Sequence, residues 1–139
     1  MQTLYKNQTL LLLLLILTSI PLVFYSTTQS MLEVWINDSS YNHGFLIFPI
    51  SFWIIYQNKT QILNTQRTLE IRALVLFIPA LLLWYVSSSI SINVVEQLSM
   101  ISIILITVWL LLGPKIFSIT IFPLTFLFLS VPLGKSLVP

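Results

Sequence analysis

The chain of 139 residues contains no cysteine, so it has no disulfide bond, no thiolate metal site and no thiol nucleophile. Charged residues are almost as scarce, at 7% against about 25% in soluble domains. This is too little charge to solvate a globular surface, and 57% of the residues are apolar, so we expect the protein to lie in a lipid bilayer. The six basic residues form no cluster, which argues against a nucleic-acid partner.

Other residue types that carry common chemistry are also rare. The only histidine is His43, and a lone histidine cannot assemble a metal site, so we expect no metal ion. The three glycines form no phosphate-binding loop, and the four acidic residues form no carboxylate pair at helical spacing. We therefore expect no cofactor.

Long apolar segments dominate the rest of the sequence. At about 20 residues per membrane-spanning helix, they predict an all-α, polytopic transmembrane helical bundle with about five spans in a single domain, residues 1–139. The expected spans are approximately residues 9–25, 41–57, 73–92, 94–112 and 116–133. Gly113-Pro114-Lys115 predicts a tight turn between the last two spans. No small-residue cleavage site follows Tyr25, which favours a retained first span over a cleaved signal peptide.

The first polar connection, residues 26–43, has two interpretations. Met31, Leu32, Trp35 and Ile36 would share one face if the segment were helical, and such a helix would lie in the interface plane of the membrane. The alternative is a loop with scattered apolar residues. The pattern does not choose between them.

Basic residues predict the orientation. With a cytoplasmic N-terminus, five of the six basic residues lie on the cytoplasmic side, and only Lys135 lies outside. The five are Lys6, Lys59, Arg67, Arg72 and Lys115. In this orientation the loop at residues 35–43, the serine-rich end of the third span and the C-terminal tail all face the exterior. We expect them to meet there.

Three residues of that loop are candidates for a function, and each also has a structural interpretation. His43 suits binding of a substrate group or proton transfer, or it is a structural residue at the outer end of a span. Asp38 either pairs with His43 or receives the basic end of a partner, or it is a solvated acid or a helix N-cap. Trp35 is either a recognition surface or an anchor at the membrane interface.

Two segments resemble the exosortase family of bacterial membrane proteins. Trp35-Ile36-Asn37-Asp38-Ser39-Ser40-Tyr41-Asn42-His43-Gly44, continued to Pro49-Ile50-Ser51, resembles the family pattern Trp…Asp…Tyr-x-His-Gly…Pro-Ile-Ser. Residues 122–134 resemble a Phe-Pro…Phe-Leu…Val-Pro-x-Gly run. The candidate motif residues on the substrate side are Trp35, Asp38, Tyr41, His43, Gly44, Pro132 and Gly134.

The resemblance implies a multi-pass protein of the bacterial cytoplasmic (inner) membrane. Exosortases cleave and transfer exported proteins whose C-terminal sorting signal contains Pro-Glu-Pro, a hydrophobic span and a basic tail. Their genes often accompany genes for extracellular polysaccharide. A cysteine, an arginine and a histidine carry out the peptidase and transpeptidase chemistry.

The family cysteine lies beyond the segment that matches Pro132 to Gly134, and His43 does not match the catalytic histidine. We therefore expect no catalytic residue in this chain. We expect it to correspond to the N-terminal part of an exosortase-like protein, as an inactive fragment or half. The expected partners are the lipid bilayer, the sorting-signal helix of an exported protein and the missing C-terminal half.

Two other functions remain open at this stage. The chain could be a small, non-enzymatic membrane scaffold or accessory subunit that binds a partner through its outer loop. A third interpretation is half of a transporter that must dimerise.

Overall fold

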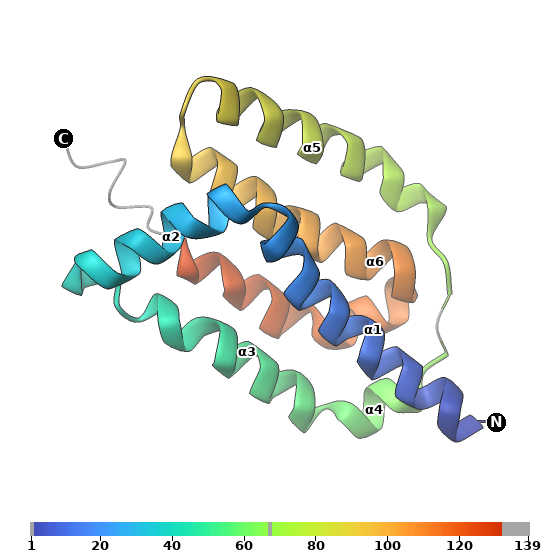
Figure 1. Ribbon diagram of the computed structural model, residues 1–139. Coiled ribbons are helices and arrows are strands. Elements are labelled where there is room, and N and C mark those ends of the chain that lie inside the picture. Colours follow the sequence, from blue (N-terminus) through green and yellow to red (C-terminus); the bar gives the residue numbers. More distant parts are fainter. Residues whose placement is uncertain (1, 67, 132–139) are drawn as a thin grey trace.

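The computed structural model describes residues 2–66 and 68–131, and this part of the chain is helical with no β-strand (Figure 1). The all-α prediction is therefore confirmed. The α-helices are α1 (Gln2–Val23), α2 (Tyr25–Asn37), α3 (Gly44–Gln57), α4 (Lys59–Leu63), α5 (Leu74–Ser89) and α6 (Asn93–Phe126). Three 3-10 helices connect or extend them: η1 (Ser39–Tyr41), η2 (Ile71–Ala73) and η3 (Leu127–Ser130).

The long helices run between two ends of the molecule (Figure 1). Residues 35–44, 89–93 and 127–131 lie at one end, which we call the motif end. Residues 58–66, 68–73 and 111–115 lie at the other, which we call the basic end. This alternation follows the predicted order of five helical segments. Helices α3 and α5 and the two arms of α6 each run from one end to the other, and α1 and α2 together cover that length around a bend (Figure 1).

Gly113 divides α6 into a hairpin. Its φ of 91° and ψ of 168° lie in a region that is essentially restricted to glycine. Pro114 then starts the second arm, where a missing N–H is tolerated. The tight turn predicted at residues 113–115 is therefore present, and it lies at the basic end (Figure 1).

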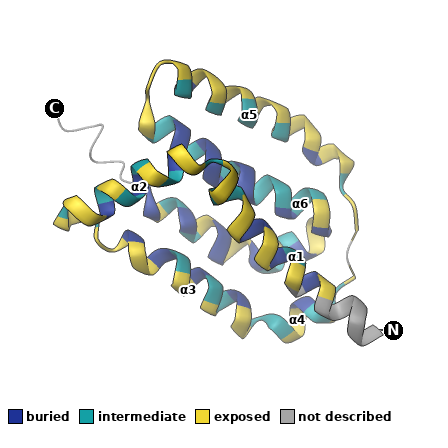
Figure 2. Ribbon diagram, viewed as in Figure 1, coloured by how far each residue is buried: buried dark blue, intermediate teal, exposed yellow. Residues whose placement is uncertain are grey.

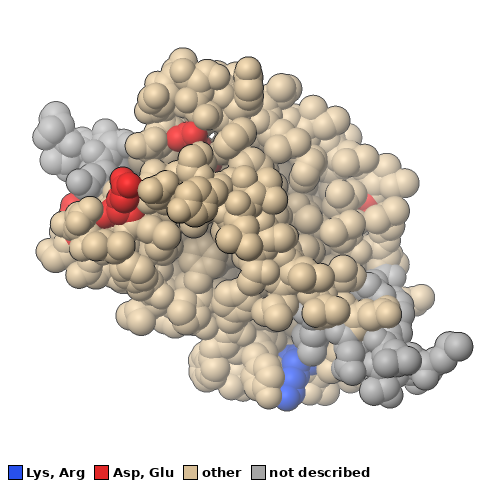
Figure 3. Space-filling view, in the orientation of Figure 1, with Lys and Arg blue, Asp and Glu red and all other residues tan. Residues whose placement is uncertain are grey.

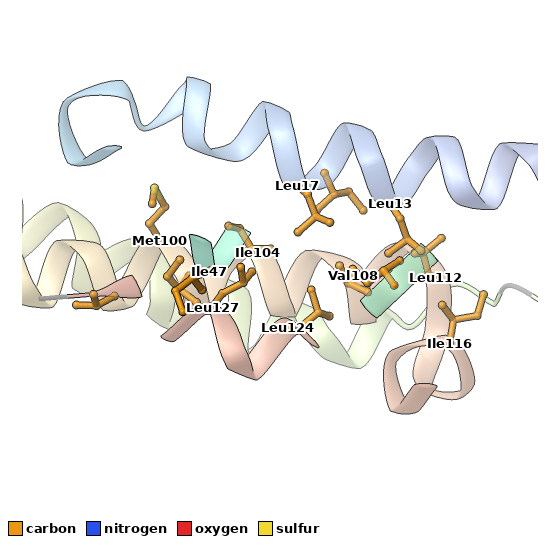
Figure 4. Close-up of a cluster of buried hydrophobic side chains, with 14 of the residues drawn as sticks. Leu13, Leu17, Ile47, Met100, Ile104, Val108, Leu112, Ile116, Leu124 and Leu127 are labelled. Carbon is orange, nitrogen blue, oxygen red and sulfur yellow. The ribbon is translucent and has the colours of Figure 1, made fainter. Parts of the chain in front are cut away.

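The α6 hairpin is the centre of the packing. Met100, Ile104, Val108 and Leu112 recur every four residues and are all at most 1% exposed, so they form one continuous face of the first arm. Leu124 from the second arm joins them (Figure 4). Side chains of α1 and α3, among them those labelled in Figure 4, cover this face.

The outward surface of α5 is apolar. Its exposed side chains, shown by the yellow ribbon in Figure 2, include Val75, Ile78, Leu82, Tyr85 and Val86. Exposed hydrocarbon of this extent is the surface that a lipid bilayer covers. This apolar surface agrees with the prediction of a helical protein embedded in a membrane.

Length and composition identify fewer candidate spans in the described residues than the five that the sequence predicts. In this part of the chain two helical stretches, Ile71–Ser89 and the kinked Asn93–Ser130, are long and apolar enough to cross a membrane. A third is present if α1 and α2, bent by 88° from each other, form one broken span. Helix α3 has 14 residues, which rise about 21 Å and fall short of a hydrocarbon core of about 30 Å. The five-span count stays a prediction.

Helix α2 resolves the two interpretations of residues 26–43 in favour of a helix. Met31 and Trp35 are 1% and 5% exposed, and α2 packs against α6, but Ile36 is 66% exposed. The four residues therefore do not share one buried face. The buried residues of α2 are Thr27, Met31 and Trp35, which are spaced four residues apart. Within the second expected span, residues 41–57, Tyr41 belongs to η1 and α3 starts at Gly44.

The described basic residues Lys59, Arg72 and Lys115 lie at the basic end, and three of the four acids lie toward the motif end. Asp38 lies at the motif end, Glu33 is on the neighbouring α2 and Glu96 is in the first turn of α6. Figure 3 shows most of the visible acidic atoms toward the left of the molecule, one further acidic spot at the right, and basic atoms at the lower edge. The fourth acid, Glu70, lies at the basic end beside Arg72. Lys59 and Lys115 are among the described basic residues of the opposite end. The separation agrees with the predicted charge bias, while the cytoplasmic side itself stays a prediction.

Candidate functional site

Trp35 joins the two motif segments. It lies in the last turn of α2, and its indole Nε1–H donates a hydrogen bond to the carbonyl oxygen of Ser130 at 2.8 Å. The two residues are 95 positions apart, and the bond is buried. An unsatisfied buried donor would cost about 1–3 kcal/mol. Trp35 therefore fixes η3 against the end of α2.

Gly44 provides the space that the indole occupies. A Cβ added to this residue would overlap the Trp35 side chain at Nε1. Phe45 meets the same indole edge-to-face, with ring centroids 5.3 Å apart, and Phe48 lies at 6.2 Å. Glycine is required here for its size, since α3 begins directly against the tryptophan ring.

Asp38 stabilises the turn between α2 and α3. Its Oδ1 accepts a hydrogen bond from the backbone N–H of Ser40 at 3.0 Å, and its carbonyl accepts from the N–H of Tyr41 at 3.0 Å. This is the capping role that short acidic side chains perform at helix starts. No hydrogen bond or ion pair joins Asp38 to His43 within the described residues.

His43 is exposed at the start of α3. Its ring centroid lies 6.4 Å from that of Tyr41, and the rings are tilted by 38°. The imidazole makes no hydrogen bond to another described residue, whereas the backbone carbonyl of His43 accepts from the N–H of Leu46 at 2.9 Å. The side chain is thus open to a ligand on the outer surface of the loop.

Sequence reasoning missed Asn42, which closes the end of α2. In the orientation that satisfies both of its polar atoms, the amide nitrogen donates to the carbonyl oxygens of Trp35 and of Asp38, the latter at 3.2 Å. Carbonyls at a helix C-terminus lack partners within the helix. The available signal was the preference of asparagine for turns.

A second missed contact joins the same two segments. Ser51 ends the Pro-Ile-Ser part of the first segment, and its Oγ–H donates to the carbonyl oxygen of Pro123 at 2.9 Å. This bond is buried and spans 72 positions. Together with Trp35 and Ser130, it holds the two motif segments side by side along α3 and the second arm of α6.

Two of the seven candidate residues, Pro132 and Gly134, lie outside the described residues. The last described position, Val131, is 4% exposed, and its N–H donates to the carbonyl of Phe128 at 3.2 Å. The other five candidates, Trp35, Asp38, Tyr41, His43 and Gly44, lie together at the motif end. In the described part of the chain, no three His, Asp or Glu side chains are grouped as metal ligands.

Comparison with known proteins agrees with the two segments. The family model for transmembrane exosortases matches residues 35–139, about three quarters of the chain. The match begins at Trp35 and includes every contact of the candidate site described above. No curated protein and no solved structure gives a match. With both motif segments inside the matched region, the chain belongs to the transmembrane exosortase family.

Proposed function

We propose that this chain is the N-terminal, substrate-side part of a membrane transpeptidase that processes exported proteins carrying a C-terminal sorting signal. The observation that carries the proposal is the pair of buried hydrogen bonds, Trp35 to Ser130 and Ser51 to Pro123. They give the two family segments a shared packing role that apolar sequence alone does not require. The family match supports the reaction class.

In the motif end, buried residues support a loop whose exposed side can contact a peptide. Trp35 and Gly44 form the buried support, and His43 stands on the exposed side with Asn42. A loop that is held rigidly from beneath can present polar groups to an extended peptide in one geometry. In this proposal His43 and Tyr41 contact the sorting signal next to its cleavage point.

The chemical step needs a nucleophile that this chain lacks. Acyl transfer by a thiol requires a cysteine beside a base, and residues 1–139 contain no cysteine. The nucleophile therefore comes from outside these residues. We propose that the chain is inactive alone and that its partner is a C-terminal exosortase part.

The proposed location is the bacterial inner membrane, with several spans and with the motif end outside. The support is the separation of charge, because the described basic residues Lys59, Arg72 and Lys115 lie at the opposite end. Basic loops remain on the cytoplasmic side in bacterial membrane proteins. The substrates would then be exported proteins of cells that make extracellular polysaccharide.

A chimera tests the function. The region of a full-length exosortase that corresponds to this chain is replaced by residues 1–139, and processing of a reporter with a Pro-Glu-Pro sorting signal is measured. We expect processing by the chimera and none by residues 1–139 alone. Trp35→Phe should reduce processing by the chimera, while Trp53→Phe, at a tryptophan that is 61% exposed, should leave it unchanged.

Two outcomes would contradict the proposal. Processing by the isolated chain would show that it carries its own nucleophile. A chimera that is stable in the membrane but inactive would favour the non-enzymatic scaffold, whose binding surface would be the exposed side chains Ser39, Ser40, Asn42 and His43. Co-purification with a partner would then replace processing as the measured function.

A further inference from the structure

A chain of hydrogen bonds joins α2 to α5 and α6. On the α5 side, the indole Nε1–H of Trp84 donates to the hydroxyl oxygen of Thr27 at 2.8 Å. On the α6 side, the amide Nε2–H of Gln97 donates to the hydroxyl oxygen of Ser30 at 2.9 Å. The Ser30 hydroxyl in turn donates to the Thr27 carbonyl at 2.6 Å. Polar side chains of two other helices therefore hold the first two turns of α2.

Gln97 satisfies only part of its hydrogen-bonding capacity. The residue is 1% exposed, and its Oε1 is buried and accepts no hydrogen bond from any described residue. An unpaired buried acceptor disfavours folding by at least about five-fold in the equilibrium constant. One hydrogen bond between helices in a membrane favours folding by about three-fold. The bond to Ser30 therefore does not offset the burial of Oε1, and Gln97 lowers the stability of the bundle.

The hydrophobic pattern of α2 does not select the rotation that the helix adopts. The polar Thr27 is buried in line with Met31 and Trp35, while the apolar Ile36 is 66% exposed. Successive residues of a helix are about 100° apart, so a rotation by that angle would turn Leu32 and Ile36 inward instead. Apolar contacts are not directional and fit either rotation. Hydrogen bonds are directional, so the bonds of Thr27 and its neighbour in the chain of bonds select the observed one.

The break before α2 explains why its first turns need such bonds. Phe24 is not helical, with φ −94° and ψ 52°, and α2 is bent by 88° from α1. The Thr28 hydroxyl holds the bend to α1 by donating to the Pro21 carbonyl at 2.7 Å, but it donates no hydrogen bond to the backbone of α5 or α6. Trp35 lies about two turns beyond Thr27 on the same buried stripe. A rotation of the first turns would therefore also move Trp35.

We infer that Gln97 is a positioning residue, which fixes the rotation of α2 and lowers the stability of the fold in doing so. Through α2 it orients Trp35 and the loop at residues 35–44. The rotation and the loss of stability follow from hydrogen bonds and burial in α2, α5 and α6, so they do not depend on the proposed transpeptidase role. The effect of Gln97 on processing rests on that proposed function.

Two substitutions break the same hydrogen bond with opposite expected effects on stability. Gln97→Met keeps the length of the side chain, removes the unpaired Oε1 and leaves the Ser30 hydroxyl bonded to the Thr27 carbonyl. The midpoint of unfolding in mixed detergent micelles should therefore stay the same or rise. Ser30→Ala leaves both the nitrogen and the oxygen of the Gln97 amide without a partner. Its unfolding midpoint should fall.

The distance between two spin labels measures the rotation of α2. Because the sequence contains no cysteine, Glu33→Cys on the exposed side of α2 and Ser118→Cys on an exposed side of α6 can carry the labels. Pulsed electron paramagnetic resonance should give one narrow distance in the chain with these two changes alone. Gln97→Met and Ser30→Ala should each add a second distance, shifted by up to about 8 Å, since a rotation by 100° moves a side chain that far on a helix about 11 Å wide.

Ser99→Ala is the matched control. Ser99 is also a buried polar residue of the first arm of α6, at 2% exposed, but its hydroxyl donates to the Val95 carbonyl of its own helix at 2.7 Å. This variant should keep the single narrow distance. A single narrow distance in Gln97→Met would overturn the role of Gln97 in the rotation. A lower unfolding midpoint in Gln97→Met would show that Oε1 has a partner and would overturn the loss of stability.

Processing by the chimera tests the effect on the motif end. Gln97→Met should process the reporter more slowly than Ser99→Ala, although it does not lower stability, whereas a purely structural residue would lower both together. Unchanged processing in a Gln97→Met chimera that shows the second distance would overturn this effect. If the unsubstituted chimera fails to process the reporter, the proposed function fails, and the distances in the isolated chain still decide whether Gln97 fixes the rotation of α2.

Discussion

The two ends of the bundle are built in different ways. At the motif end, side chains satisfy the backbone: Asp38 and Asn42 close the turn, and Trp35 bonds to Ser130. At the basic end, hydrogen bonds between backbone groups join the segments. The N–H of Thr68 donates to the carbonyl of Leu112 at 3.3 Å, and the N–H of Glu70 donates to that of Leu110 at 2.9 Å. The motif end therefore depends on residue identity, and the basic end depends on chain conformation.

Among the described residues, each end has one glycine in a crowded position, and these two glycines illustrate the difference. Gly44 is crowded by a side chain, that of Trp35. Gly113 is crowded by the Thr68 hydroxyl and also by backbone, with the Thr68 carbonyl oxygen 2.7 Å from the position of an added Cβ, and its φ is +91°. Substitution of Trp35 can remove the contact at Gly44, whereas substitution of Thr68 cannot remove the backbone contact at Gly113. The following predictions test this contrast, from the largest expected effect to the smallest.

Gly113→Ala should be the most damaging substitution. The strained φ and the contact with backbone add, for an expected loss of about 3 kcal/mol of unfolding free energy. Equilibrium unfolding in mixed detergent micelles, followed by circular dichroism, measures it. Thr68→Ala in the same chain should restore little, because the backbone atoms of residue 68 remain in place. Full rescue would contradict the backbone origin of the constraint.

Gly44→Ala should cost about 2 kcal/mol through overpacking against the indole. Here Trp35→Leu should recover part of the loss, since it removes the ring that the new methyl group meets. A double-mutant cycle in the same unfolding assay measures the coupling between the two positions. Additive effects would show that the ring and residue 44 do not touch.

Ser51→Ala should cost about 1 kcal/mol, because it leaves the buried Pro123 carbonyl without its donor. Ser118→Ala is the matched control. Its hydroxyl donates to the Lys115 carbonyl in the same helical turn, and the residue is exposed. The control should change stability by less than about 0.5 kcal/mol. Equal losses would indicate that the bond between the motif segments adds nothing.

The smallest expected effect is a pH dependence at the basic end. A hydrogen bond from the Arg72 guanidinium, whose Nε lies 2.8 Å from Oε1 of Glu70, lowers the pKa of the Glu70 carboxyl below its ordinary value. The ion pair therefore stabilises the fold above that ordinary pKa, and its contribution is lost as the pH falls through the lowered one.

The melting temperature between pH 6 and pH 3 measures the contribution of this ion pair. In Arg72→Gln the melting temperature should depend less on pH. In Lys115→Gln, which removes another exposed cation of the basic end, the pH dependence should stay unchanged. A melting temperature that falls more steeply with decreasing pH in Arg72→Gln would contradict a stabilising ion pair.

Local patterns were sufficient to predict several features of the fold. The apolar runs predicted the order of the helical segments, and Gly113-Pro114 predicted the turn of the α6 hairpin, because a positive φ favours glycine wherever it occurs. Pro49, Pro79 and Pro123 lie inside helices, a position that helices of membrane bundles tolerate.

Long-range packing explains what could not be predicted. The bend after Val23 depends on the Thr28–Pro21 hydrogen bond and on the contact of α2 with α6. The partner of Trp35 is 95 positions away, so no local pattern identifies it. The same holds for Ser51. Trp35 and Gly44 were identified by resemblance to a family, whereas the reason for their pairing, an indole against a missing Cβ, is visible only in the fold.

The central claim is that the motif end forms one surface on the exterior of the cell. The absence of cysteine allows single cysteines to be introduced without background. A membrane-impermeant maleimide applied to intact cells should label Ser39→Cys and Ser89→Cys. It should label Thr65→Cys and Ser118→Cys only after the membrane is permeabilised. Labelling of Ser39→Cys without Ser89→Cys would separate two parts of the motif end, and the reverse pattern at all four positions would place that end in the cytoplasm.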